Sequence, residues 1–315
     1  MPRRSRHLLR ILLVALVGVA VADGEQDAAC AAARRPAIAG AYAAHPVVLA
    51  VVVLWCNPST PDRLLLRGLG GGGGGGGGFP HRVTLRRAAS ASLNSRFLPD
   101  PSISTAAVAV ADDDVLPDAA ALSFAFAAWQ QAAAARGGSP LVGFFPRSHH
   151  LDLARGRWAY TAAEPGRYSM VLTKFMVLGA DLLHRYSCSP ELAAARAVVD
   201  RERNCEDILM NFVAAEEAGA GPVLVEAGSV RDWGDPRNDA NAGAGDEERG
   251  AMRDVGLSST GGTAHWEKRG ECITEFHRLL GRMPLRYSHG KVVEAAVGEQ
   301  GLCSKGGRLV RCDKE

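Results

Sequence analysis

Residues 106–114 read Ala-Ala-Val-Ala-Val-Ala-Asp-Asp-Asp, an apolar run that changes abruptly into three consecutive carboxylates. The apolar part, Ala106–Ala111, predicts a buried strand, because strands covered on both faces are apolar throughout. The acidic triplet then lies at the carboxyl end of that strand, where α/β sheets bind their ligands. Alternate side chains of an extended chain share a face, so Asp112 and Asp114 point the same way. An isolated acidic triplet is usually solvated surface, but at this place a bound Mg²⁺ or Mn²⁺ would relieve the repulsion.

Apolar stretches that suit strands alternate with helical ones along the rest of the chain. This alternation predicts an α/β fold with a largely parallel central sheet. Nine consecutive glycines, Gly70–Gly78, predict a flexible surface loop, because a homopolymer lacks the spaced glycines of a phosphate-binding loop. The expected strands are Val47–Trp55, Val83–Leu85, Leu141–Phe145, Ser169–Phe175 and Pro222–Val225, and the expected helices are Ala119–Ala135, Pro190–Val199, Asp207–Glu217 and Ile273–Leu280.

Composition narrows the function. The chain has 315 residues, which suits one large domain or two small ones, and its hydrophobic content of 47% is ordinary for a globular protein with a sizeable core. Its net charge is only +2 and its aromatic content 6%, so nucleic acid is not an expected partner. No Gly-x-Ser-x-Gly, His-Glu-x-x-His or Walker motif is present, which removes the common hydrolase and nucleotidase signatures.

The first segment has the pattern of a secretory leader. Four arginines precede the apolar run Ile11–Ala22, which ends in Ala-Val-Ala. This run is shorter than the ~20 apolar residues that span a bilayer, so residues 1–22 predict a cleaved signal peptide, with an uncleaved anchor and membrane association as the alternative. Residues 23–45 are Ala-rich and predict a stem or linker before a domain over residues 46–315. The expected location is the secretory pathway, in the Golgi or the ER lumen.

Three further clusters carry polar chemistry. Asn204-Cys205-Glu206-Asp207 suits either the start of a helix or a carboxylate presented to a ligand. Arg269 lies in a charged run before the last helix and is a candidate for binding phosphate. The third cluster, His149, His150 and Asp152, is a weak metal candidate, because adjacent side chains on an extended chain face opposite ways.

These segments resemble a known family when they are taken in order. The series is Ser92–Phe97, Asp112–Asp114, Leu141–Arg147, Tyr168–Thr173, Asn204–Phe212 and, more weakly, Met283–Ser288. Their order and spacing are similar to glycosyltransferase family 64, the exostosin-like retaining transferases with a GT-A fold. The short chain suggests a plant-type member.

The resemblance implies a site and its ligands. The donor would be a nucleotide-sugar, with UDP-N-acetylhexosamine expected and GDP-mannose as the alternative, and the acceptor a glycan or glycolipid. Mn²⁺ would be the cofactor, bound by Asp114 and Asp112. Asp207 would lie beside the reacting sugar carbon, and Arg269 would hold the pyrophosphate. The remaining residues near the nucleotide would be Asn57, Asn94, Arg96, Asp112 and Asp113.

The resemblance also implies a disulfide between Cys205 and Cys272. The chain has seven cysteines, and Cys56, beside the expected donor loop, is the candidate for the unpaired one. Asp207 would stabilise positive charge on the sugar or trap it covalently, and a front-face route fits equally well.

One departure qualifies the resemblance. The family opens with a strand and helix that hold uridine, and no such pair is recognisable before Val47. The first βα unit is therefore expected to be missing, which leaves a catalytically inactive binding relative as the competing hypothesis.

Overall fold

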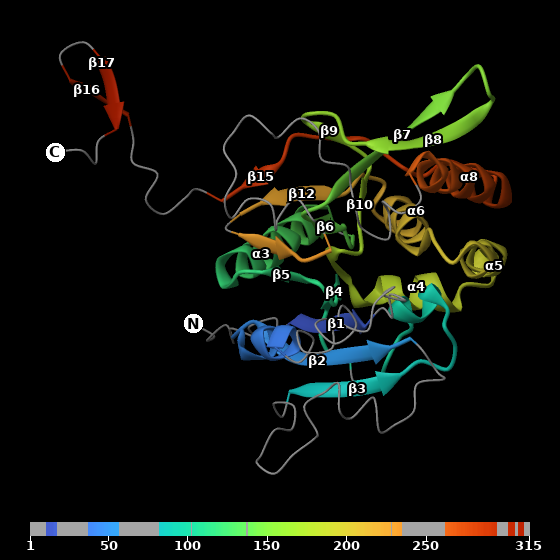
Figure 1. The fold of residues 1–315 in the computed structure, drawn as a ribbon, viewed down its shortest axis with the longest axis horizontal. Coiled ribbons are helices and arrows are strands. Elements are labelled where there is room, and N and C mark those ends of the chain that lie inside the picture. The colour runs from blue at the N-terminus through green and yellow to red at the C-terminus, as the bar shows by residue number, and fades with distance from the viewer. Residues whose placement is uncertain are drawn as a thin grey trace, which may run out of the picture.

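A computed structural model of the chain describes residues 11–17, 37–56, 82–101, 103–136, 138–227, 229–234, 262–294, 302–305 and 308–311. The asparagine at position 57, the nine-glycine run and the polar region 235–261 lie outside the described residues. The described part has a mixed α/β architecture built around one large sheet, as expected from the alternating pattern (Figure 1).

The central sheet has eight strands in the order β15-β12-β6-β11-β4-β1-β2-β3. Every neighbouring pair is parallel except those that β11 makes with β4 and β6. The expected largely parallel sheet is therefore confirmed. Its strands are β1 (Ile11–Val17), β2 (Val48–Trp55), β3 (Val83–Arg87), β4 (Ala107–Asp112), β6 (Val142–Gly143), β11 (Phe175–Gly179), β12 (Val223–Glu226) and β15 (Val292–Val293).

Helices cover both faces of this sheet, which explains why β4 is apolar at every position before Asp112. Val108 and Val110 face one core, and the alternating residues Ala107, Ala109 and Ala111 face the other. The first core contains η1 (Leu93–Phe97), α4 (Ala180–Cys188), η2 (Pro190–Leu192), α5 (Ala193–Glu202), α6 (Glu206–Ala218) and α8 (Gly262–Leu280). The second contains α3 (Ala119–Arg136) and a helix at residues 37–44, on the opposite side in Figure 1.

The apolar run that resembles a signal sequence forms strand β1 in this fold. β1 lies between β2 and β4 and is parallel to both, with Leu16 opposite Asp112. A strand buried in a parallel sheet and the apolar centre of a signal peptide have the same local pattern. The roles of signal and anchor stay predictions, and cleavage after Ala22 would remove β1 from the sheet.

The first βα unit is present, so the expectation that it is missing was wrong. β1 and the helix at residues 37–44 both precede β2. The expectation of a stem over residues 23–45 was also wrong for the helical part, where Ile38, Ala39, Tyr42 and Ala43 are buried. Tyr42 fixes this helix to the sheet layer, because its hydroxyl donates a hydrogen bond to the carbonyl of Val115, 3.0 Å away.

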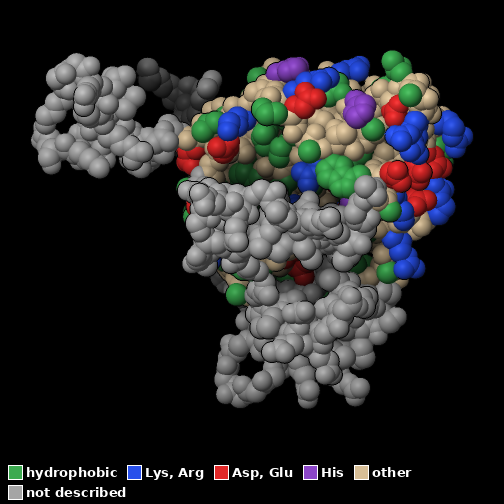
Figure 2. Space-filling view, turned by 45° about the horizontal axis from the view of Figure 1, so that its top comes forward, with side chains coloured by type: hydrophobic (Ala, Val, Ile, Leu, Met, Phe, Trp, Pro, Cys, Tyr) green, Lys and Arg blue, Asp and Glu red, His purple; other side chains and the backbone are tan. Residues whose placement is uncertain are grey.

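Smaller strands complete the described structure. β5 (Val115–Pro117) pairs with β13 (Val230–Asp232), and β7 (Pro146–Asp152) forms a hairpin with β8 (Arg157–Ala162) that extends from the body in Figure 1. The others are β9 (Arg167–Tyr168), β10 (Met170–Val171), β14 (Ser288–His289), β16 (Leu302–Lys305) and β17 (Arg308–Arg311). Figure 2 shows acidic and basic side chains interspersed on one face. Among the described helices, none has the length and apolarity needed to cross a membrane.

Candidate active site

The acidic triplet forms a tight turn at the carboxyl end of β4. β4 ends at Asp112, and β5 begins at Val115 immediately after the turn. The backbone of the turn is held from two sides: the Asp112 amide donates to the carbonyl of Lys174 (3.2 Å), and the Asp114 carbonyl accepts from the amide of Trp233 (2.8 Å). The sheet therefore presents these carboxylates at the edge where the sequence predicts them.

Asp114 is the member of the triplet that most needs a cation. Its Oδ1 is buried and has no hydrogen-bond partner among the described residues. Burial and, after it, the nearby charges of Asp112, Asp113 and Asp232 together raise the pKa of Asp114 to about 7, against the opposing charge of Lys174. An oxygen that is buried, unpartnered and surrounded by like charges fits a ligand for a divalent cation.

Arg96 connects the acidic turn to the start of α6. It lies in the short helix η1, which begins where the Ser92 hydroxyl accepts the amide of Asn94. Its Nη1 is 3.3 Å from Oδ1 of Asp112 and 3.1 Å from Oε1 of Glu206. Burial lowers the pKa of Arg96, but the charges of Glu206 and Asp112 outweigh that effect and the net shift is upward. The guanidinium is thus a fixed positive charge within the site.

Asn94 is held by the protein itself. Its Nδ2 donates to the carbonyl of Arg196 (3.0 Å) and to Oδ1 of Asp200 (2.9 Å), while its Oδ1 accepts from the hydroxyl of Tyr186 (2.6 Å). These partners lie on α4 and α5, so the side chain of Asn94 anchors η1, and with it Arg96, to the helical layer.

Asp207 and Arg269 form a buried ion pair at the first turn of α6. Nη2 of Arg269 is 2.5 Å from Oδ2 of Asp207, and its Nη1 donates to Oδ1 of Asn204 at 2.8 Å. The guanidinium also lies 4.4 Å from the ring centroid of Tyr160, a cation–π geometry. Burial lowers the pKa of Arg269, but the neighbouring charge of Asp207 makes the net shift upward. Nε of Arg269 is buried and has no partner among the described residues, which leaves a donor for an anion.

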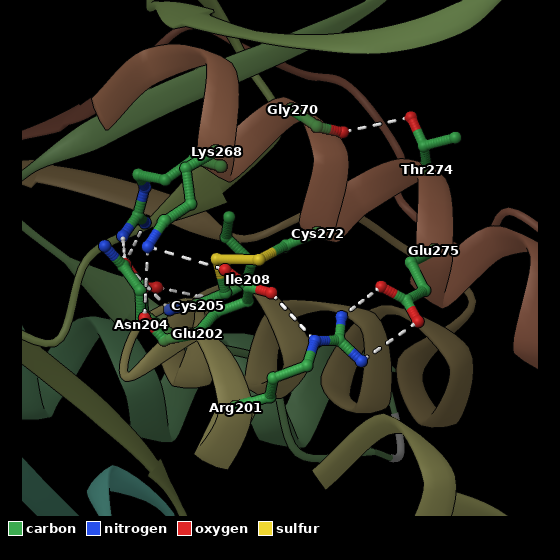
Figure 3. The surroundings of a disulfide bond; sticks show 12 residues. Arg201, Glu202, Asn204, Cys205, Ile208, Lys268, Gly270, Cys272, Thr274 and Glu275 are labelled. Carbon is green, nitrogen blue, oxygen red and sulfur yellow. Dashed lines mark hydrogen bonds and ion pairs between the residues drawn. A yellow bond between two sulfur atoms is a disulfide. The ribbon is translucent and has the colours of Figure 1, made fainter. Parts of the chain in front are cut away.

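A disulfide joins the two elements that carry this pair. Cys205 and Cys272 are bonded, with their Cα atoms 6.4 Å apart, which confirms the pairing that the resemblance implied. Figure 3 shows the bond between the start of α6 and the middle of α8, with salt bridges from Lys268 to Glu202 (3.4 Å) and from Arg201 to Glu275 (2.5 Å) on either side. Asp207 lies two residues beyond one cysteine and Arg269 three residues before the other, so the bond fixes their separation.

The Glycosyl transferase family 64 domain matches residues 34–297. The chain belongs to glycosyltransferase family 64. Its family-64 relatives include "Glycosyltransferase family protein 64 C3" of Arabidopsis thaliana, 49% identical over 280 residues, which are 88% of this chain and 80% of that protein. "Glycosylinositol phosphorylceramide mannosyl transferase 1" of Arabidopsis thaliana is 29% identical over 263 residues (81% and 70%). "Exostosin-like 2" of Homo sapiens is 29% identical over 259 residues (79% and 69%). The protein is therefore a glycosyltransferase.

Glu206 is a residue of this family-64 site that the sequence analysis did not select. Its carboxylate is buried between Arg96 and the hydroxyl of Thr173, 3.4 Å away. Burial raises the pKa of Glu206, the charge of Arg96 lowers it, and that of Asp207 raises it again, with a net upward shift. A helix start with two adjacent acids looks like ordinary charge placement at the positive end of the helix. Only the long-range contact with Arg96 shows that Glu206 belongs to the site.

The weaker metal candidates do not converge. His149 is buried, its Nδ1 is 2.7 Å from the hydroxyl of Ser169, and its ring stacks on Tyr287 with centroids 5.1 Å apart. No group of three His, Cys, Asp or Glu side chains within the described ranges is arranged to hold a metal by itself. A metal at Asp114 would therefore need further oxygen ligands from a bound phosphate or water.

The free thiols are only partly those expected. Cys56 is buried and unbonded at the end of β2, as expected for the unpaired cysteine. Cys188, at the end of α4, is also free and is exposed. The other three cysteines lie where side chains are not described.

Proposed function

We propose that this glycosyltransferase is a retaining, GT-A-type enzyme that moves a sugar from a nucleotide-sugar donor to a glycan or glycolipid acceptor and uses Mn²⁺ at Asp114 and Asp112. The observation that carries the proposal is the buried Oδ1 of Asp114, which lies near three other carboxylates and has no hydrogen-bond partner in the described ranges of the chain. Hard cations such as Mg²⁺ and Mn²⁺ are commonly held by one or two carboxylates together with substrate phosphates, which matches this donor set.

The metal would supply positive charge where the departing nucleotide develops negative charge. Arg269 is placed to assist, because its buried Nε donates to no described residue and its guanidinium is oriented by Asp207 and Tyr160. Arg96 brings a second buried guanidinium against Asp112 and Glu206. Preorganised charges of this kind need no rearrangement when negative charge forms.

Asp207 is the residue proposed to face the reacting sugar carbon. Positive charge builds on the sugar ring as its bond to phosphate breaks, and a nearby carboxylate stabilises that charge. In the structure Asp207 accepts from Nη2 of Arg269 and from the amide of Ile208, so its orientation is fixed before a ligand binds. The same carboxylate serves a covalent route and a front-face route equally well.

Two donors remain in competition. UDP-N-acetylhexosamine is the donor expected from the family resemblance. GDP-mannose is favoured by the 29% identical relative whose name is a mannosyl transferase for glycosylinositol phosphorylceramide, a glycolipid. The alternative of an inactive binding relative loses its main support, because the strand and helix thought to be missing precede β2 in the structure.

The secretory pathway is the proposed location, with the Golgi or the ER lumen as the compartment. The disulfide between Cys205 and Cys272 supports it, because disulfides persist in oxidising compartments and are rare in the cytosol.

The test is transfer and hydrolysis with UDP- and GDP-sugars, with and without Mn²⁺, on wild type and three variants. Asp114→Asn should abolish the response to Mn²⁺, and Asp207→Asn should lower kcat by about 10³-fold or more while nucleotide binding is retained. Asp152→Asn is the matched control, since this aspartate pairs with Arg155 in the β7–β8 hairpin. Nucleotide binding by wild type without turnover of any donor would favour the inactive relative, and full Mn²⁺-dependent transfer by Asp114→Asn would refute the metal assignment.

A further inference from the structure

The segment that follows β13 lies directly against the acidic turn. β13 pairs antiparallel with β5 and places Asp232 opposite Val115, the first residue after the turn. The next amide, that of Trp233, donates to the carbonyl of Asp114 at 2.8 Å. Residues 230–234 therefore support the turn through backbone contacts from a part of the chain more than a hundred positions away.

Gly234 makes the closest approach to the carboxylate itself. A Cβ atom built at Gly234 would lie 2.3 Å from Oδ2 of Asp114, a distance that two such atoms cannot adopt without one moving. The amide of Gly234 donates to Oδ1 of Asp232 at 3.1 Å, which fixes the glycine in this place. One carboxylate oxygen of Asp114 is thus in close contact with Gly234, while the other, Oδ1, is buried and has no partner in the part of the chain that the structure describes.

Lys174 fastens this segment to the sheet. Its Nζ is 2.6 Å from Oδ2 of Asp232, whose side chain is only 5% exposed. Its backbone carbonyl accepts the amide of Asp112. Lys174 therefore contacts the acidic turn with its main chain and the supporting segment with its side chain, immediately before β11 begins.

We propose that Gly234 and the Lys174–Asp232 ion pair are positioning elements for Asp114: the pair holds segment 230–234 in place, and the absence of a side chain at Gly234 sets where the Asp114 carboxylate lies. The inference rests on the proposed role of Asp114 as a metal ligand. Residues that contact a metal-binding side chain, and not the metal itself, orient that side chain and so affect metal affinity.

The first experiment measures Mn²⁺ binding by electron paramagnetic resonance, with Mn²⁺ and UDP or GDP as probes, on wild type, Gly234→Ala and Gly40→Ala. Gly234→Ala should weaken Mn²⁺ binding by about tenfold or more, because its methyl group displaces the carboxylate. Gly40→Ala is the matched control, since a Cβ there meets nothing within 4 Å, and it should bind Mn²⁺ as wild type does. Unchanged affinity in a folded Gly234→Ala protein would overturn the role of Gly234.

The second experiment follows hydrogen exchange in the peptide covering residues 230–234. Lys174→Met removes the positive charge 2.6 Å from the buried carboxylate of Asp232, so the amides of Trp233 and Gly234 should exchange faster than in wild type. Lys174→Arg should restore slow exchange and Mn²⁺ affinity, since a guanidinium also pairs with a carboxylate. Equal exchange in Lys174→Met and wild type would overturn the fastening role.

The proposed metal site and the proposed positioning role are distinguished by different results. If wild type binds no Mn²⁺ with either nucleotide, the proposed metal site fails. If wild type binds Mn²⁺ and the Gly234 and Lys174 variants match it in affinity and exchange, the metal site stands and the positioning role fails.

Discussion

Loss of the Cys205–Cys272 disulfide should lower the free energy of unfolding by an amount that depends on the number of residues between the two cysteines. The bond closes a segment with a sequence separation of 67 residues. Loop-closure entropy for a segment of this length corresponds to about 4 kcal/mol at 25 °C. For a chain of this size, that loss lowers Tm by roughly 6 °C. Both sulfurs are buried, so alanines at these positions also leave small voids that add to the loss.

The assay compares thermal unfolding of wild type and the Cys205→Ala/Cys272→Ala double variant, each with and without reductant. Reductant should lower the Tm of wild type toward that of the double variant. Cys188→Ala is the control, because this thiol is exposed and free and its removal should leave Tm unchanged. The reasoning would be refuted if the double variant unfolded at the Tm of oxidised wild type.

The same variant tests how the bond serves the site. The disulfide joins the start of α6 to α8, and the Asp207–Arg269 ion pair spans the same two helices. The flanking salt bridges in Figure 3 join α5 to α8. We expect the ion pair to persist in the double variant. Its activity at temperatures where it is folded should therefore fall only slightly, although its Tm is lower. Activity that disappears while the protein remains folded would show that the bond has a direct role in the site.

Two further predictions follow from buried elements. Burial, with the charges of Arg167 and His150, lowers the pKa of His149 to about 4. Between pH 6.5 and 4 the unfolded chain therefore binds more protons at this residue than the folded chain does. The free energy of unfolding should fall by about 3 kcal/mol as the pH falls through that window. Urea unfolding at several pH values should show a much shallower fall for His149→Phe. His150→Gln should change the fall only slightly, because it removes only one of the charges that lower the pKa of His149. Equal slopes for His149→Phe and wild type would contradict the assignment. Removal of residues 1–22 takes away β1, which pairs with both β2 and β4, so the truncated chain should lose cooperative unfolding in calorimetry, and a truncated chain with the Tm of the full chain would show that the sheet folds without this strand.

The sequence by itself determined the elements with strong local signals. The apolar run before Asp112 placed the acidic turn at a strand end, because a short strand covered on both faces is apolar at every position. The helical spacing of apolar residues predicted α3 almost to its ends, and α6 within one residue. The resemblance of the Asn204–Phe212 segment then identified Asp207 and its neighbouring cysteine.

The tertiary structure decided what local patterns cannot express. The run Ile11–Val17 has the pattern of a signal peptide and of a buried parallel strand alike, and only its pairing with β2 and β4 distinguishes them. From the sequence, Glu206 is an ordinary charge at a helix end. Only its contact with Arg96, 110 positions earlier in the chain, shows that it belongs to the site. No local pattern connects Lys174, Asp232 and Gly234 with Asp114. The pairing of β5 with β13 brings Asp232 and Gly234 to Asp114, and the pairing of β11 with β4 brings Lys174 there. Local periodicity reports which side of an element is buried, whereas charge pairing and close backbone approach depend on contacts between distant segments.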